Sequence, residues 1–243
     1  MKRLLLSLVV AGLMAVQLPA AELAQLKVLV VTGGHGFPKE PFLQVFKDNP
    51  AITFTHAEHS KGTADVYDRA DLAGYDVVLL YDMPRTLTAA QKSAFLALLD
   101  RGTGLVVTHH ALASYQGWPD YERIIGGRYI EKPAKGVEPT DTPSGFQHDE
   151  DIPVVVGAKR HPVAAGLANF TIHDEIYWGY RVGADVTPLL TTTHPKSGNP
   201  LAWVRTERKS RVVYLLLGHD AAAYANPNYR RLIANAIQWT ARR

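Results

Sequence analysis

Leu105-Val106-Val107-Thr108-His109-His110-Ala111 is a short apolar run that ends in two adjacent histidines. Its β-branched residues predict a buried strand. In open parallel α/β sheets, ligands bind at the carboxyl ends of the strands, where exposed loops stand on a rigid base. The stretch therefore predicts a strand that delivers two imidazoles to the functional edge of such a sheet.

In the N-terminal half, around this stretch, predicted strands alternate with predicted helices. Three further strands are predicted at residues 27–32, 52–55 and 75–82, and two helices at residues 39–47 and 89–101. Parallel strands need crossover connections of about a dozen residues, which helices supply. The N-terminal half is therefore predicted to be a doubly wound α/β sheet.

The C-terminal half follows a different pattern. Residues 128–147 lose periodicity and are rich in Pro and Gly, which predicts a long loop, either a lid or an excursion. Closely spaced strands are predicted at residues 152–156, 187–192, 201–205 and 211–217, and a final helix at 227–241. We therefore expect a mostly parallel sheet with some antiparallel strands in the C-terminal half.

The N-terminus is typical of a secretory signal peptide, with Lys2 and Arg3 before an apolar core and small residues near Ala20 and Ala21. This core is shorter than the ~20 residues that span a bilayer. We expect residues 1–21 to be removed and residues 22–243 to form one exported, periplasmic domain that does not associate with the membrane. Without Lys2 and Arg3 the formal net charge falls from +3 to +1, which argues against a nucleic-acid partner. The chain has no Cys, so no disulfide or thiolate nucleophile is available.

Histidines recur where predicted strands end. His35 follows the first strand, His109 and His110 the fourth, and His219 the last. Because the carboxyl ends of parallel strands meet at one edge, these side chains are predicted to converge. The Gly33-Gly34-His35-Gly36 loop lacks the spacing of a dinucleotide or phosphate-binding motif, so no nucleotide cofactor is indicated.

Residues 173–178 combine one histidine, two carboxylates and two aromatics, a composition suited to a polar ligand. Asp174 and Tyr177 are candidate contacts for a sugar, together with Trp118 and Asp220. The alternative is that the aromatics are ordinary core residues. The run His148-Asp149-Glu150-Asp151 is similar in composition, although it could equally form a solvated face.

Neutral imidazoles beside a carboxylate suit zinc, manganese or iron, so a divalent metal is the one cofactor to consider. No compact metal motif such as His-Glu-x-x-His occurs, and ligands would have to come from distant segments. The candidates are His35, His109, His110, Glu175 and His219. No Gly-x-Ser-x-Gly nucleophile motif occurs either.

Several segments together carry a resemblance to a known family. They are residues 30–35 (VVTGGH), 104–111 (GLVVTHHA), Trp118-Pro119, Gly126-Gly127, 161–163 (HPV), 174–177 (DEIY), 201–205 (LAWVR), 211–214 (RVVY), 218–220 (GHD) and 235–239 (NAIQW). In this order they resemble the ThuA-like, trehalose-utilisation family over essentially all of residues 22–243. The resemblance implies the class I glutamine amidotransferase-like, flavodoxin-related fold.

The resemblance also implies a chemistry. In that fold the turn after the fourth strand carries a catalytic Cys, and His109 or His110 stands there instead, which excludes glutamine hydrolysis. The family's association with sugar catabolism implies a small-molecule carbohydrate partner, in particular a 3-keto sugar or 3-keto glycoside. Such a substrate loses its glycosidic bond once a base has removed the acidic proton at C2.

These implications lead to a lyase or hydrolase acting on keto-glycosides. We expect His109 or His110 to be the base and Glu175 and His219 to be its catalytic partners. His35, Trp118, Asp174, Tyr177 and Asp220 are the expected substrate-binding residues. Two alternatives stay open at this point: a non-catalytic periplasmic sugar-binding protein and a metal-dependent hydrolase of another substrate. The sequence does not define the oligomeric state.

Overall fold

The computed structural model describes residues 24–133 and 141–242. The predicted signal peptide, residues 1–21, lies outside these ranges. Among the described residues, no helix has both the length and the apolar character that crossing a membrane requires.

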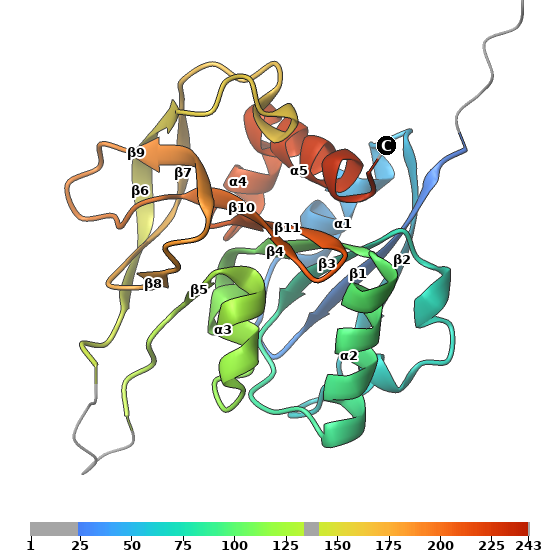
Figure 1. The fold of residues 1–243 in the computed structure, drawn as a ribbon. Coiled ribbons are helices and arrows are strands. Elements are labelled where there is room, and N and C mark those ends of the chain that lie inside the picture. Colours follow the sequence, from blue (N-terminus) through green and yellow to red (C-terminus); the bar gives the residue numbers. More distant parts are fainter. Residues whose placement is uncertain (1–23, 134–140, 243) are drawn as a thin grey trace, which may run out of the picture.

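One nine-stranded sheet organises the chain, in the order β2-β1-β3-β4-β11-β10-β9-β6-β7 (Figure 1). The first five of these strands run parallel: β2 (Ile52–Glu58), β1 (Leu26–Gly33), β3 (Val77–Asp82), β4 (Gly104–Thr108) and β11 (Ser210–Leu215). The remaining four pair antiparallel: β10 (Ala202–Glu207), β9 (Thr187–Thr192), β6 (Gly145–Val156) and β7 (Phe170–Trp178). The predicted α/β sheet, with antiparallel strands in its C-terminal half, is confirmed.

Helices cover both faces of the parallel strands (Figure 1). One face carries α1 (Lys39–Lys47), α4 (Ala221–Ala225) and α5 (Pro227–Thr240), and the other carries α2 (Ala89–Arg101) and α3 (Pro119–Ile125). Strands buried on both faces read as continuous apolar runs, which is why Val28 to Val31 are all apolar and fully buried.

The boundaries of α2 have local causes. The Thr88 side chain accepts from Gln91 N, and the Gln91 side chain accepts from Thr88 N, which forms a capping box. At the other end Gly102 adopts φ +87°, a left-handed conformation that glycine reaches without strain. These features make the predicted helix at residues 89–101 match the observed one.

The rest of the described chain consists of short elements. β5 (Gly127–Arg128) and β8 (Arg181–Val182) form a separate two-stranded sheet. Four 3₁₀ helices occur in the described ranges: η1 (Asp65–Asp68), η2 (Leu72–Gly74), η3 (His109–Ala113) and η4 (Pro162–Ala164).

The C-terminal half departs from prediction at β6 and β7. β6 begins at Gly145, so the predicted loop at residues 128–147 is too long, and β7 was not predicted as a strand. β7 could not be predicted because the side chains on both of its faces are buried near its C-terminal end. Asp174 and Ile176 occupy one face and Glu175 and Tyr177 the other, so neither an apolar run nor a simple alternation appears in the sequence.

Candidate functional site

A pocket of about 420 Å³ lies at the carboxyl ends of the parallel strands, within the range of about 300–1,000 Å³ typical of small-molecule sites. Residues that follow β1, β3, β4, β5 and β11 form part of its wall, and residues of β6 and β7 complete it. Its lining residues are His35, Met83, His110, Ala113, Tyr129, Glu131, Phe146, His148, Glu175, Tyr177 and His219. The structure therefore brings the strand-end histidines together with Glu175, as the sequence pattern suggested.

His109 lies behind this pocket and is fully buried. Its φ of +51° is in the left-handed region, which costs a non-glycine residue about 1–3 kcal/mol. Two contacts from β11 and the residue after it hold this conformation: Tyr214 OH donates to the His109 carbonyl at 3.0 Å, and His109 Nδ1 donates to the Leu216 carbonyl at 2.7 Å. The turn after β4 thus holds a fixed imidazole whose Nε2 points toward the pocket.

Glu175 connects His109 to the pocket, because it contacts His109 and also lines the pocket. His109 Nε2 lies 2.9 Å from Glu175 Oε2 and 3.0 Å from Tyr177 OH. Burial lowers the pKa of His109, but the hydrogen bond that its ring donates to Glu175 and the charge of Asp174 outweigh this effect and raise that pKa overall. Burial likewise raises the pKa of Glu175, and His109 more than reverses this. Both shifts favour the charged pair, an imidazolium beside a carboxylate, and the carboxylate lines the pocket.

His148 reaches the same carboxylate because β6 contains a bulge. Gln147 pairs with Ile176 and Glu150 with Asp174, so His148 and Asp149 together face the single residue Glu175. Asp149 takes the left-handed φ of +59°. His148 Nδ1 consequently lies 3.2 Å from Glu175 Oε1. The local sequence does not predict His148 as a site residue, because the bulge depends on pairing with a distant strand.

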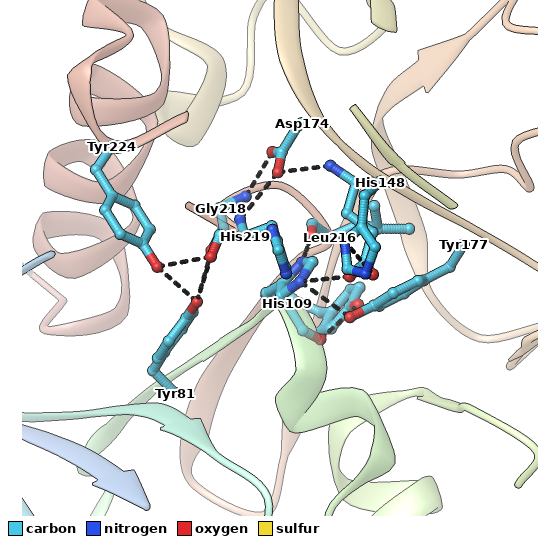
Figure 2. Close-up of polar contacts among 11 residues, drawn as sticks. Tyr81, His109, His148, Asp174, Tyr177, Leu216, Gly218, His219 and Tyr224 are labelled. Carbon is cyan, nitrogen blue, oxygen red and sulfur yellow. Dashed lines mark hydrogen bonds and ion pairs between the residues drawn. The ribbon is translucent and has the colours of Figure 1, made fainter. Parts of the chain in front are cut away.

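His219 is held by its backbone. Asp174 Oδ2 accepts from Gly218 N at 2.7 Å, and Asp174 Oδ1 accepts from His219 N at 2.9 Å (Figure 2). On the other side, Tyr81 OH donates to the Gly218 carbonyl and Tyr224 OH to the His219 carbonyl, each at 2.9 Å. Burial, and then the charge of His109, lower the pKa of His219, so its imidazole is neutral.

His35 and His110 form a stacked pair with ring centroids 4.4 Å apart. Neither ring nitrogen of His110 has a hydrogen-bond partner among the described residues. Burial, followed by the charge of His109, lowers the pKa of His110 well below its ordinary value. Of the two adjacent histidines, His110 lines the pocket and His109 supports it from behind.

Three of these groups form a donor set that could hold a metal. The ligand atoms of His109, Glu175 and His219 all lie within 4.8 Å of one another. The Nδ1–H of His109 donates to a backbone carbonyl, which is how metal-bound histidines are usually oriented. Two imidazoles and one carboxylate match the ligands of catalytic zinc, so the residues fit such an ion. His35 and His110, also predicted as ligands, are not part of this set in the described ranges.

Several predicted substrate-binding residues have other roles. Trp118 is 6% exposed and packs against Phe95 in the core, outside the pocket, because it follows β4 on the side of the sheet covered by α2 and α3. Asp220 caps α4, with its carboxylate accepting from Ala222 N and Ala223 N. Neither Trp118 nor Asp220 lines this pocket.

Asp174 and Tyr177 keep a connection to the site. Asp174 is 2% exposed and acts through the turn that carries His219, so it is a positioning residue instead of a sugar contact. Tyr177 lines the pocket and its ring stacks on His109. The exposed aromatic at the pocket is Phe146, which is 53% exposed. It was not predicted as a site residue because it lies in the stretch predicted as a loop.

Comparisons with known proteins agree with this architecture. The family model ThuA, described as trehalose utilisation, matches residues 27–240. No curated protein matches the chain in sequence. A ThuA-like protein from Parabacteroides merdae superposes with a TM-score of 0.76 at 19% identity, covering 90% of each chain.

Two other solved structures share the fold. A ThuA-like protein from Bacteroides uniformis gives a TM-score of 0.65 at 22% identity, covering 92% of this chain and 95% of that one. A cytoplasmic protein from Salmonella typhimurium LT2 gives 0.61 at 12% identity, covering 88% and 99%. At these identities the structural likeness establishes the fold alone.

Proposed function

The chain belongs to the ThuA family of trehalose-utilisation proteins, and on this premise we propose that its pocket cleaves 3-keto glycosides after proton abstraction next to the ketone. The observation that carries the proposal is the pairing of a carboxylate, Glu175, with a neutral imidazole, His219, in one pocket. A carboxylate base beside a neutral imidazole is a known arrangement for moving a proton from a carbon adjacent to a carbonyl.

The reaction divides into balanced steps. Glu175 takes the proton from C2 of the sugar, and the C–H electron pair forms an enolate whose charge rests on the C3 oxygen. The enolate then reforms the ketone while the C1–O bond breaks, and the proton taken from C2 ends on the departing oxygen. The products are an alcohol and an unsaturated 3-keto sugar. Addition of water across its new C1=C2 bond gives the free 3-keto sugar.

The surrounding residues supply the remaining functions. His219 donates a hydrogen bond to the enolate oxygen, which is the usual way an enzyme stabilises charge that develops in a transition state. His109 fixes the Glu175 carboxylate from behind, at 2.9 Å. The His148 imidazole lies 3.2 Å from the other oxygen of Glu175 and is placed to relay a proton. Proton transfer by such groups contributes about 10²–10⁴-fold in rate.

A second candidate function is favoured by the donor set of His109, Glu175 and His219. These residues would hold a divalent cation, which supplies Lewis-acid polarisation and an activated water when bound. The chain would then be a metal-dependent hydrolase, and Glu175 would be a ligand instead of a base. A non-catalytic sugar-binding protein would not require a buried imidazolium behind the pocket carboxylate.

The test is incubation of the purified protein with a 3-keto glucoside in D₂O, with chelator or with added Zn²⁺ or Mn²⁺. We expect deuterium at C2 and release of the aglycone in the presence of chelator. Glu175→Gln should abolish both signals, and the exposed His173, on the same strand, serves as the control in His173→Gln. Turnover that depends strictly on added metal supports the second candidate, and binding without turnover or exchange in any condition contradicts both.

A further inference from the structure

The bulge that carries His148 toward the pocket is flanked by Gln147 and Glu150. These two residues pair with Ile176 and Asp174 of β7. Because Ile176 and Asp174 are two positions apart on a strand, the side chains of Gln147 and Glu150 lie on one face of the β6–β7 pair. None of these four residues lines the pocket. The flanks of the bulge therefore face away from the site that His148 enters.

Polar contacts join the two flanks to each other. The Gln147 side-chain amide donates to Oε1 of Glu150. The Lys196 ammonium lies 3.2 Å from Gln147 Oε1 and 3.5 Å from Glu150 Oε1. The Nε2 atom of His194 lies 3.0 Å from the other carboxylate oxygen of Glu150, Oε2. The flanks are thus connected across the bulge and bound to the loop between β9 and β10.

This loop orients the imidazole of His194. Lys196 N donates to His194 Nδ1 at 3.4 Å, so Nε2 carries the hydrogen and donates to Glu150. His194 N donates to Thr192 Oγ1 at 3.0 Å, and the Asn199 side chain bonds the backbone N and carbonyl of Thr192 at 2.7 and 3.0 Å. Burial raises the pKa of Glu150, but the hydrogen bond from His194 and the charge of Lys196 lower it overall. A well-bonded loop therefore holds a charged acceptor beside the bulge.

The bulge depends on such contacts because its own backbone does not favour it. Asp149 adopts φ +59°, which is unfavourable for a residue with a side chain. His148 and Asp149 take part in no ladder pair with β7, and the His148 side chain is 50% exposed. Neither strand pairing nor burial fixes His148, so its position is set by the residues that flank the bulge.

We propose that Glu150 and His194 are positioning residues, which hold the β6 bulge in the shape that keeps the His148 imidazole against Glu175. This inference rests on the proposed function, in which His148 relays a proton. It gives the loop between β9 and β10 a role in that function. Because neither Glu150 nor His194 lines the pocket, both act through His148.

A double-mutant cycle with a 3-keto glycoside tests the inference. Glu150→Ala and His194→Ala should each lower kcat about tenfold or more, since a displacement of about 1 Å at a catalytic group can cost 10²-fold. KM should stay within about twofold, and in the His148→Ala background the same substitutions should change kcat by less than about twofold, because the group they position is absent. Asp151→Ala is the matched control, since Asp151 is the exposed neighbour of Glu150 on β6.

Nuclear magnetic resonance tests the geometry without turnover. The ring centroids of His148 and His219 lie 4.6 Å apart, so their ring protons should show a nuclear Overhauser contact in the wild type. The contact should persist in Asp151→Ala and be lost in Glu150→Ala and in His194→Ala. Loss of the contact in a wild type that shows no turnover would still support the positioning, while leaving the proposed chemistry unsupported.

Lys196→Ala keeps the inference testable if the other two variants do not fold, because the Lys196 side chain is exposed and contacts both flanks of the bulge. It should weaken the same Overhauser contact and lower kcat in the same direction. A contact that persists in every folded variant would overturn the inference. So would losses in kcat of equal size with and without His148, since they would reflect a general loss of structure.

Discussion

His148 lies 3.2 Å from Glu175, Nδ1 to Oε1, because β6 has one residue more than β7 at this point. The neighbouring acidic residues, Asp149 and Asp151, remain in solvent at 84% and 77% side-chain exposure. The bulge therefore turns the His148 side chain toward the pocket, while its acidic neighbours stay in solvent. Bulges are frequent beside active sites for this reason.

Replacing His148 by Ala should lower kcat/KM for a 3-keto glycoside by about 10²-fold, the lower end of what a proton-transferring group contributes. The control is His173→Ala, because His173 lies on the partner strand β7 and contacts the exposed Asp151 at 2.9 Å. It should change kcat/KM by less than about twofold. Steady-state measurements of kcat/KM for both variants on one substrate test this prediction. An equal loss of kcat/KM in the two variants would contradict a role for His148.

The parallel half of the fold could be predicted because its strands are buried on both faces. Val28 to Val31 and Leu105 to Val107 are continuous apolar runs, and Thr88 and Gly102 mark the ends of α2. β7 could not be predicted in the same way, since Asp174 and Glu175 are buried on opposite faces by different partners. A local sequence pattern does not indicate that a carboxylate is buried when the hydrogen bonds it accepts come from a turn far away in the sequence, as they do for Asp174.

For the site, strand-end position placed His35, His109 or His110, and His219 in one cleft, whereas Glu175 was predicted from the composition of residues 173–178 and from the family resemblance. The sequence could not rank His109 against His110, because adjacent side chains diverge and the left-handed φ of His109 is set by contacts to β11 and Leu216. It also assigned Trp118 to the site on composition, which does not distinguish a rim aromatic from a core aromatic.

Asp174→Asn should destabilise the protein and impair catalysis together. The carboxylate accepts from Gly218 N and His219 N, and an amide can accept through only one atom. We expect a loss of about 1–3 kcal/mol, with Tm falling by roughly 2–4 °C per kcal/mol. Asp151→Asn, at an exposed position on β6, should leave Tm unchanged. A catalytic defect in Asp174→Asn that persists well below its Tm would support the positioning of His219, whereas full activity there would refute it.

Added Zn²⁺ should stabilise the wild type, because His109, Glu175 and His219 match its ligand preference. At about 100 times the dissociation constant, binding contributes ~2.7 kcal/mol. This gain in Tm should be absent in His219→Ala and retained in His173→Ala. If Glu175 is the base, turnover of a 3-keto glycoside should fall as Tm rises, since the carboxylate is then engaged. An increase in turnover with Zn²⁺ would instead support the second candidate function, a metal-dependent hydrolase.

Stability should decrease as the pH falls through the range of histidine titration, in part because of His161. Its Nδ1 accepts from Val163 N at 3.2 Å, and burial, then the charge of Arg211, lower its pKa. A lowered pKa in the folded state means that the unfolded chain binds the proton first, so this contribution is present above about pH 6.5 and is lost below it. His161→Asn retains a capping acceptor but cannot titrate. Its Tm should therefore fall less than that of the wild type between about pH 7.5 and pH 5.5, and an equal fall would exclude His161 as a contributor.

Phe146 and Trp118 should respond in opposite ways to substitution. Phe146 is 53% exposed at the pocket, so Phe146→Ala should raise KM for the sugar about 3- to 10-fold, as expected for the loss of an aromatic contact, with little change in Tm. Trp118 is buried against Phe95 and Tyr121, so Trp118→Phe should lower stability by about 1–3 kcal/mol and leave KM unchanged. Thermal melts and KM measured on both variants check this crossed pattern. A raised KM in Trp118→Phe at full stability would return Trp118 to the sugar site, because only a direct contact with substrate would then explain the change.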